Sequence, residues 1–214
     1  MKKLNTFQKI LKKFRYGLVM MVIRSRLTRF NIDISPYHWS LEADPERQPP
    51  EIPGHFDDYS FEFFGAKEME MIGPRVSNQN TPVAEMLERL DQGLVCFGAK
   101  YKGEIAAFTW ARLYDVDNRF LSVKLKPNEA YLFDTHTMKA FRGKNLAAYL
   151  RARTFRAFGE KMGKDTFYSL HISFNKSSTR FKQKLNVKTL RTGLYIGLFN
   201  KYHWNITLRD NEKK

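Results

Sequence analysis

The spacing of apolar side chains predicts a strand that runs directly into a helix in the second half of the chain. Residues 130–138, AYLFDTHTM, are rich in the β-branched and aromatic residues that favour strands. From Lys144 onward, side chains suited to a buried helix face recur at helical spacing, at Leu146, Leu150, Thr154 and Phe158. The junction holds Arg142, Gly143 and Asn145. Glycine and asparagine best tolerate a left-handed backbone, and a strand–turn–helix junction directs free N–H groups to one point, so this turn is predicted to hold a phosphate.

The remaining patterns predict a mixed α/β protein, with strands, a helix, a strand, a helix and further strands in that order. Residues 94–114 are predicted to form a β-hairpin that turns at Lys102 and Gly103. A helix over 82–90 is expected to be capped by Thr81, with Met86 and Leu90 facing inward. The other predicted elements are strands at 59–64, 167–173, 187–199 and 203–208 and a helix at 175–185.

The first 58 residues differ in composition from the rest of the chain. Residues 1–35 are predicted to form a basic, amphipathic, helical extension, with lysines between the apolar positions Leu4, Phe7, Ile10, Leu11 and Phe14. Two interpretations stay open: the segment lies on an anionic membrane surface, or it docks on the folded domain. Residues 36–58 are rich in proline and are expected to form an irregular connection, and residues 59–214 to form the folded domain.

Composition narrows the class of protein. A chain of 214 residues that is 43% hydrophobic can bury one good core. The single cysteine, Cys96, excludes an intramolecular disulfide and favours a reducing, cytoplasmic location, and its apolar surroundings predict a small buried side chain. The sequence has no apolar run of about 18 residues, so no ordinary membrane-spanning helix is expected.

The net charge of +15 is unevenly distributed. Residues 1–30 hold nine Lys or Arg and no acid, and residues 139–191 hold fourteen Lys or Arg against Glu160 and Asp165. Such a basic region attracts a polyanion, whether coenzyme A, an acidic acyl carrier protein or nucleic acid. Nucleic acid is the least favoured of these, because the sequence shows no zinc-ligand spacing, RNP-like motif or helix-turn-helix pattern. The histidines likewise lack metal-ligand spacing, so no metal site is expected.

Two motifs resemble those of the GNAT superfamily of acyl-CoA-dependent N-acyltransferases, and the resemblance covers roughly residues 59–200. The family's pyrophosphate turn has Arg or Gln, two variable residues, Gly, one variable residue, then Gly or Ala. Here the matching residues are Arg142, Gly143, Lys144, Asn145, Leu146 and Ala147, with asparagine where glycine is expected. The second motif resembles Asn175, Ser178 and Phe181, followed by an imperfect match at Asn186 and Val187.

The resemblance implies a GNAT-like twisted mixed sheet flanked by helices, and acetyl-CoA or another acyl-CoA as co-substrate without a metal. It implies that N–H groups around Thr137 and Met138 face the pantetheine and thioester. Those from Gly143 to Ala147 would bind the pyrophosphate, with Arg142 and Lys144 adding charge. Asn175 would hydrogen-bond the pantetheine arm, with Ser178 one helical turn away on the same face.

The proton carriers are less closely defined by the sequence. Asp134 and His136 alternate with Phe133 and Thr135, so both are expected on one face of the strand, where either could accept the amine proton. A packing role for His136 is the alternative. Many GNAT proteins have a tyrosine that acts as the acid at the position where this sequence has Lys182. The resemblance implies that the Lys182 ammonium would stabilise the thiolate or contact a CoA phosphate. Alternative acids are Tyr168, Tyr195 and Tyr202.

The function predicted from these features is transfer of an acetyl or other acyl group from acyl-CoA to an amine, by direct attack on the thioester. One alternative is an acyltransferase that takes its acyl group from an acidic acyl carrier protein. Another is a catalytically inactive GNAT-like binding module, because Asn145 and Lys182 depart from the family pattern. The predicted location is cytoplasmic, with the N-terminal segment offering a contact to the inner face of a membrane.

Overall fold

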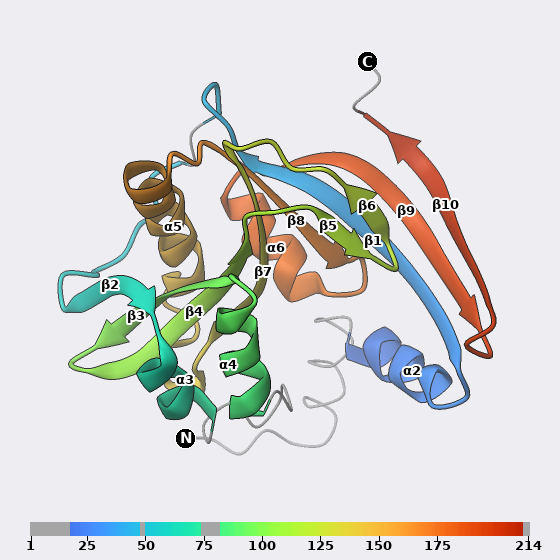
Figure 1. Ribbon diagram of the computed structural model, residues 1–214, viewed down its shortest axis with the longest axis horizontal. Helices are drawn as coiled ribbons and strands as arrows, with labels where there is room; N and C mark the ends of the chain where they lie inside the picture. Colours follow the sequence, from blue (N-terminus) through green and yellow to red (C-terminus); the bar gives the residue numbers. More distant parts are fainter. Residues whose placement is uncertain (1–17, 48–49, 74–81, 212–214) are drawn as a thin grey trace. The chain divides into compact units, whose positions relative to one another are not determined.

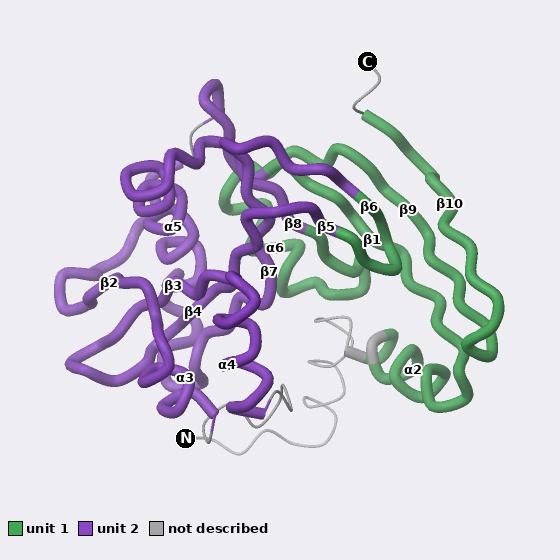
Figure 2. The backbone as a smooth tube through the Cα atoms, in the orientation of Figure 1, with its two compact units in different colours: residues 1–41, 117–122, 170–214 green, residues 42–116, 123–169 purple. Residues whose placement is uncertain are grey.

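The computed structural model describes residues 18–47, 50–73 and 82–211 (Figure 1). They belong to two compact units, each discontinuous in sequence (Figure 2). Unit 1 comprises residues 1–41, 117–122 and 170–214, and unit 2 comprises residues 42–116 and 123–169. The predicted division into 1–35, 36–58 and 59–214 stays a prediction, and the amphipathic stripe from Leu4 to Phe14 lies outside the described residues.

Unit 2 is built on a sheet with the strand order β8-β7-β4-β3-β2, in which only the β7–β8 pair is parallel. The strands are β2 (Tyr59–Phe64), β3 (Val95–Tyr101), β4 (Glu104–Arg112), β7 (Glu129–Thr137) and β8 (Thr166–Ile172), which continues into unit 1. The predicted hairpin is confirmed, with φ of 49° at Lys102 and 84° at Gly103. Positive φ at both positions matches the twist of the strands that the turn joins.

Helices cover the two faces of this sheet. They are α3 (Ala66–Ile72), α4 (Val83–Asp91) and α5 (Leu146–Met162), the last preceded by the short 3-10 helix η2 (Lys139–Phe141). Alternation along β3 sends Phe97 into the core beneath α5, with Leu150 and Phe158. It sends Cys96 into a second core beneath α3 and α4, with Met69 and Trp110. Cys96 is therefore the small buried side chain that its apolar surroundings predict.

Some local details differ from the sequence prediction. The residue that caps α4 is Pro82, and Thr81 lies outside the described residues. Helix α3 and the two-stranded ribbon of β5 (Val116–Asn118) and β6 (Leu121–Val123) are unpredicted. Each is too short to show a full period of apolar residues.

Unit 1 contains the strand order β10-β9-β1-β8. Its elements are α2 (Leu18–Thr28), β1 (Ile32–Ala43), the end of β8, α6 (Lys176–Lys184), β9 (Lys188–Leu198) and β10 (Tyr202–Asp210). The pairs β1–β9 and β9–β10 are antiparallel. The predicted helix over 175–185 and the two C-terminal strands are confirmed. Among the helices that the structure describes, none is long and apolar enough to cross a membrane.

The prediction of an irregular connection over 36–58 is wrong for its first eight residues. Strand β1 extends through Pro36, which lies opposite Leu194 of β9, and ends at Ala43. On its other side, the Pro36 carbonyl accepts a hydrogen bond from the Ser173 N–H at 2.8 Å. Proline argues against an inner strand because it has no N–H. Ser173 directly follows the last residue of β8, so the proline lies where pairing with that strand stops.

Candidate active site

The turn between η2 and α5 has the left-handed backbone that its residues predict. Gly143 has φ of 85° and Asn145, the cap of α5, has φ of 61°. A side chain added at Gly143 would meet nothing within 4 Å. Glycine is therefore required there by the backbone angle and not by a shortage of space.

The same turn leaves several backbone donors open. The first N–H groups of α5 with a partner are those of Ala148 and Tyr149, which donate to the Asn145 carbonyl at 3.0 and 3.1 Å. Within the described residues, no hydrogen bond is made by the N–H groups of Gly143, Lys144, Leu146 and Ala147. The first turn of this 17-residue helix also has no acid. Open donors, the positive end of the helix dipole and the absence of a carboxylate together favour an anion.

Two side chains fix the turn, and one of them, Arg142, also brings charge to it. Arg142 is exposed, and its Nε donates to the Thr137 carbonyl at 2.8 Å, which ties the turn to the end of β7. Asn145 donates through Nδ2 to the Pro53 carbonyl at 3.2 Å, which ties the turn to the loop before β2. Lys144 is exposed beside them. The turn is thus held from two directions, while its N–H groups stay open.

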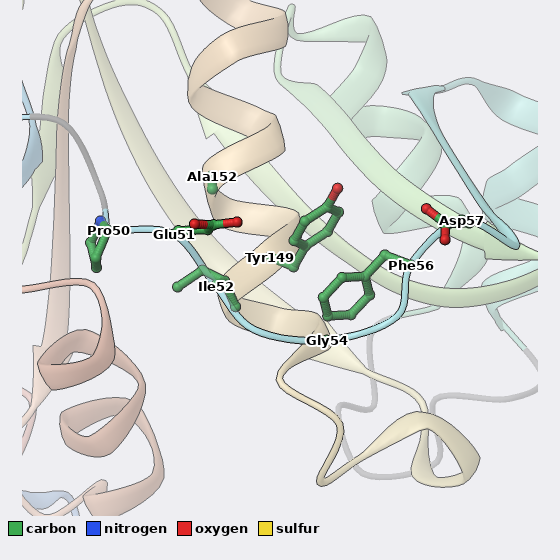
Figure 3. Close-up of a pocket in the computed structure, with 8 residues that line it drawn as sticks. All are labelled: Pro50, Glu51, Ile52, Gly54, Phe56, Asp57, Tyr149 and Ala152. Carbon is green, nitrogen blue, oxygen red and sulfur yellow. The ribbon is translucent and has the colours of Figure 1, made fainter.

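The loop over 50–57 and the first turns of α5 enclose a cleft of about 380 Å³ (Figure 3). Its floor includes the Phe56 ring, which stacks on Tyr149 with centroids 3.9 Å apart. Glu51 and Asp57 also line the cleft. Two carboxylates suit a cationic or neutral group and disfavour a phosphate, so this cleft is chemically distinct from the turn.

Strand β7 has a bulge at the position of the predicted proton carriers. His136 lies opposite Phe108 of β4 and Phe133 lies opposite Trp110, so β7 has one extra residue in this stretch. Asp134 sits in it with φ of 45°. Bulges re-aim side chains and recur beside active sites. Asp134 and His136 both lie on the α3–α4 side of the sheet, as predicted, and Thr135 between them contacts α5. The bulge breaks the predicted alternation at Phe133, which packs on the α3–α4 side as well.

Asp134 and His136 differ in what surrounds them. The Asp134 carboxylate accepts a hydrogen bond from Arg89 of α4 at 2.8 Å, and Arg89 also pairs with Glu85. The His136 ring stacks on Phe108 with centroids 5.7 Å apart. Burial, and next the charge of Arg142, lower the pKa of His136 below its ordinary value. His136 is therefore neutral near pH 7 and able to accept a proton.

A buried ion pair lies behind the bulge. Arg151 of α5 and Glu42 are 3% and 0% exposed, and Arg151 Nε lies 3.1 Å from Glu42 Oε2. Arg151 also donates to the Thr135 hydroxyl at 2.6 Å, and the Ser169 hydroxyl donates to Glu42. Sequence analysis missed this pair because its members lie in separate acidic and basic stretches. The pair connects α5, the end of β1 and the residue between the two predicted proton carriers.

In unit 1, the residues of the second motif organise the start of α6. Asn175 is the helix cap, and its Oδ1 accepts a hydrogen bond from the Ser178 N–H at 3.1 Å. The side-chain amide Nδ2 remains as its donor. Lys182 lies two turns into the helix and is 7% exposed. Such burial is unusual for lysine, whose ammonium is normally solvated.

Two histidines lie together in unit 1, and sequence analysis gave neither a role. The His38 and His171 rings have centroids 5.0 Å apart. His38 has its nitrogens 3.0 Å from the Thr192 and Ser173 hydroxyls. Both His171 ring nitrogens are buried without a hydrogen-bond partner in the part of the chain that the structure describes. Burial first, then the charges of Lys182 and His38, lower the pKa of His171 to about 3.

Comparison with known proteins places the chain in a family. The model of the acetyltransferase (GNAT) family matches residues 56–186, more than half of the sequence. The chain belongs to the GNAT family. No curated protein matches this GNAT chain.

Solved GNAT proteins share the fold of the chain at low sequence identity. A putative acetyltransferase from Novosphingobium aromaticivorans superposes with a TM-score of 0.53 at 16% identity, over 77% of this chain and 63% of its own. A tandem GNAT protein from the clavulanic acid biosynthesis pathway superposes with a TM-score of 0.55 at 14% identity, over 83% of this chain and 55% of its own. An acetyltransferase from Colwellia psychrerythraea superposes with a TM-score of 0.53 at 12% identity, over 80% of this chain and 59% of its own. The chain therefore spans 55% to 63% of the length of these three proteins.

The predicted GNAT site residues fall into two groups. Asp134, His136, Thr137, Met138 and the turn over 142–147 belong to unit 2, and Asn175, Ser178 and Lys182 belong to unit 1. Their roles toward a cofactor stay predictions. The Met138 N–H already donates to the Ala106 carbonyl at 2.9 Å. Among the alternative acids, Tyr168 contacts Glu129 at 3.2 Å in unit 2, and Tyr195 and Tyr202 lie in unit 1.

Among the described residues, no group of three or more His, Cys, Asp or Glu side chains could hold a metal ion.

Proposed function

We propose that this GNAT protein transfers an acetyl or other acyl group from acyl-CoA to an amine. The observation that carries the proposal is the turn before α5, where four backbone N–H groups have no partner among the described residues and no acid is present in the first helical turn. The diphosphate of coenzyme A has the charge and the acceptor oxygens that such a turn binds. Family membership supports the same class of reaction.

In unit 2, the turn before α5 would hold the diphosphate of the cofactor, and the end of β7 would lie along its thioester. The role of Asn175 and Ser178 is proposed for unit 1 by itself. The N–H groups from Gly143 to Ala147 bind the pyrophosphate, and the exposed Arg142 and Lys144 add charge. The backbone at Thr137 and Met138 would lie along the thioester, although the Met138 N–H is already bonded to the Ala106 carbonyl. Asn175 offers its Nδ2 to the pantetheine arm, since its Oδ1 is used as the cap of α6, and Ser178 lies on the same helix.

In the proposed reaction, the amine nitrogen attacks the thioester carbonyl carbon, the C–N bond forms and the C–S bond breaks. The neutral His136 accepts the proton that the amine loses. Asp134, held by Arg89, is the second candidate base. For Lys182, which lies in unit 1, stabilisation of a departing thiolate by its ammonium stays the prediction from the sequence. Positioning of amine and thioester supplies much of the rate acceleration.

The test is thiol release from acetyl-CoA by the purified full chain, with a panel of amines and with calorimetric titration of CoA. Amine-dependent thiol release together with CoA binding supports the proposal. Binding without release under any amine identifies an inactive binding module. The carrier-dependent alternative predicts neither CoA binding nor thiol release from acetyl-CoA. It predicts transfer only from an acylated carrier protein, at a rate that falls steeply as the salt concentration rises.

We also propose that the protein acts in the cytoplasm, since the fold uses no disulfide and its single cysteine, Cys96, is a buried packing residue.

A further inference from the structure

We propose that unit 1 docks on an anionic lipid bilayer through two adjoining turns, residues 29–31 and 199–201, which we call the tip. In this arrangement Phe30 and Phe199 enter the headgroup region, and neighbouring cations contact lipid phosphates. The proposal concerns a surface of unit 1 and is independent of the proposed acyl transfer.

The tip is formed by the α2–β1 turn and the β9–β10 turn, which lie side by side (Figure 1). The Phe199 N–H donates to the Asn31 carbonyl at 2.6 Å, and Asn200 Nδ2 donates to Asn31 Oδ1 at 2.9 Å. Phe30 is 70% exposed and Phe199 is 65% exposed, the two largest values among the large apolar side chains that the structure describes. The hydrogen bonds thus join the two turns, and each turn exposes one phenylalanine to solvent.

The backbone of the tip makes Phe199 unusual. Asn31, Phe199 and Asn200 all have positive φ, at 57°, 56° and 55°. Asparagine adopts this conformation readily, whereas a bulky aromatic residue does so rarely and at a cost in free energy. Asparagine or glycine at position 199 would suit the turn better, and an exposed ring gains nothing from packing. Strained positions of this kind are retained where they serve binding.

The positive charge of unit 1 favours an anionic lipid surface as the partner of the tip. Its described residues contain twelve Lys or Arg and three Asp. Of the three carboxylates, Asp33 pairs with Arg24 and Arg119, and Asp210 lies 4.0 Å from Arg191. Arg29 directly precedes Phe30, and Lys201 lies two residues after Phe199. Basic residues beside an apolar tip are attracted to anionic headgroups. A second copy of the chain would bring the same positive charge against itself, so charge disfavours self-association here.

The surroundings of the tip also fit a membrane interface. Strand β10 follows the tip at the edge of its sheet and exposes Tyr202 and Trp204, whose rings stack with centroids 6.2 Å apart. Tyrosine and tryptophan favour the level of the lipid headgroups. Beside the tip is a cleft of about 380 Å³, lined by Asn31, Arg119 and Asn200 among others. Asp33 also lines this cleft and pairs with Arg119 at 2.8 Å, so the cleft itself is not assigned to a phosphate.

The experiment is co-sedimentation of the full chain with vesicles of phosphatidylcholine and phosphatidylglycerol in equal parts. The test variant is Phe30→Asn with Phe199→Asn. The matched control is Tyr114→Asn with Met162→Asn, which removes two exposed apolar side chains of unit 2. Residues 1–17 are present in all samples, so a difference reports on the tip. We expect the test variant to lose about tenfold or more of its vesicle partition coefficient, and the control to keep the wild-type value.

Folding is separated from binding by the same variant. Phe199→Asn places a residue suited to positive φ in the turn, so its melting temperature should equal or exceed that of the wild type while vesicle binding falls. Unchanged partition of the test variant, or equal loss in the control, would overturn the proposal. Equal binding to vesicles of phosphatidylcholine alone would overturn the role of anionic lipid. A dimer that the test variant converts to a monomer, with partition unchanged, would assign the tip to self-association instead.

Discussion

Arg142 serves the turn between η2 and α5 in two ways. It brings positive charge to the turn, and its Nε donates a hydrogen bond to the Thr137 carbonyl. Arg142→Ala removes both, and should weaken CoA binding by about 1.5 to 3 kcal/mol, the range for a lost charged hydrogen bond. Calorimetric titration measures the change. Arg156→Ala is the matched control, because Arg156 is an exposed arginine of α5 that pairs with Glu160. Equal CoA affinity of the wild type and Arg142→Ala would contradict the assignment of this turn to the CoA pyrophosphate.

His136 has a lowered pKa because it is buried and lies near Arg142. As the base it must be neutral, so the rate of thiol release should rise with pH through a pKa below the ordinary 6.5 and then level off. His136→Phe should flatten this acidic limb and preserve CoA affinity. A pH–rate profile of each protein provides the test. An unchanged limb in the variant would make His136 a packing residue and turn attention to Asp134.

At the residue scale, the sequence predicted backbone conformation better than side-chain partners. The left-handed backbone at Gly143 and Asn145 was predictable because few other residues adopt it. The ion pair between Arg89 and Asp134 was not, since it depends on how α4 packs and on the bulge of β7. Asp134 was thus predicted as a candidate base without the arginine that holds its carboxylate.

The turn between η2 and α5 acts as one element, so a change in its backbone should move all of its N–H groups. Gly143→Ala forces a methyl group into φ of 85° and should cost about 1 to 2 kcal/mol in folding free energy. CoA affinity should fall with it as the turn relaxes. Gly143→Asn, which tolerates positive φ, is the control and should retain more of both. Urea unfolding and calorimetry report the two quantities.

Helix α5 is fixed to its sheet by a buried charge as well as by apolar packing. Arg151→Met leaves Glu42 buried without its cation, and should lower the free energy of unfolding by about 3 to 5 kcal/mol. Adding Glu42→Leu removes the stranded charge and should recover much of that loss. Urea unfolding of both single variants and the double variant gives the coupling energy. Additive effects would contradict a direct interaction between the two side chains.

Elements with a full period of apolar residues were predictable, and β1 was not. Helix α5 and strands β2 and β7 have complete patterns, and the structure confirms them. Strand β1 contains Pro36 in a proline-rich stretch, which favours an irregular connection. The sequence does not reveal that Pro36 lies beside the end of β8, where its carbonyl accepts a hydrogen bond from Ser173.

The molecule as a whole should lose stability as the solution becomes acidic. Burial depresses the pKa of His171 from 6.5 to about 3 in the fold. Between these values the unfolded chain binds a proton that the folded chain does not, so stability rises with pH and is lost as pH falls below 6.5. His171 should contribute about 1 kcal/mol of loss between roughly pH 7.5 and 5.5. Urea unfolding at both values, with His171→Leu as comparison, checks the slope. An equal slope in the variant would assign the effect elsewhere.

The position of β1 inside its sheet sets an order of events during synthesis. Ile32 pairs with Leu198, and Pro36 with Leu194, so β1 has no partner on that side until β9 has been made. A ribosome adds about 5 to 20 residues per second, so β1 waits on the order of ten seconds before it can pair. During this interval the side chains of Tyr37 and Trp39, each 2% exposed in the finished fold, are open to water or to a chaperone. Folding of unit 1 is therefore a late event, and a nascent chain that stops before β9 exposes an unpaired apolar strand.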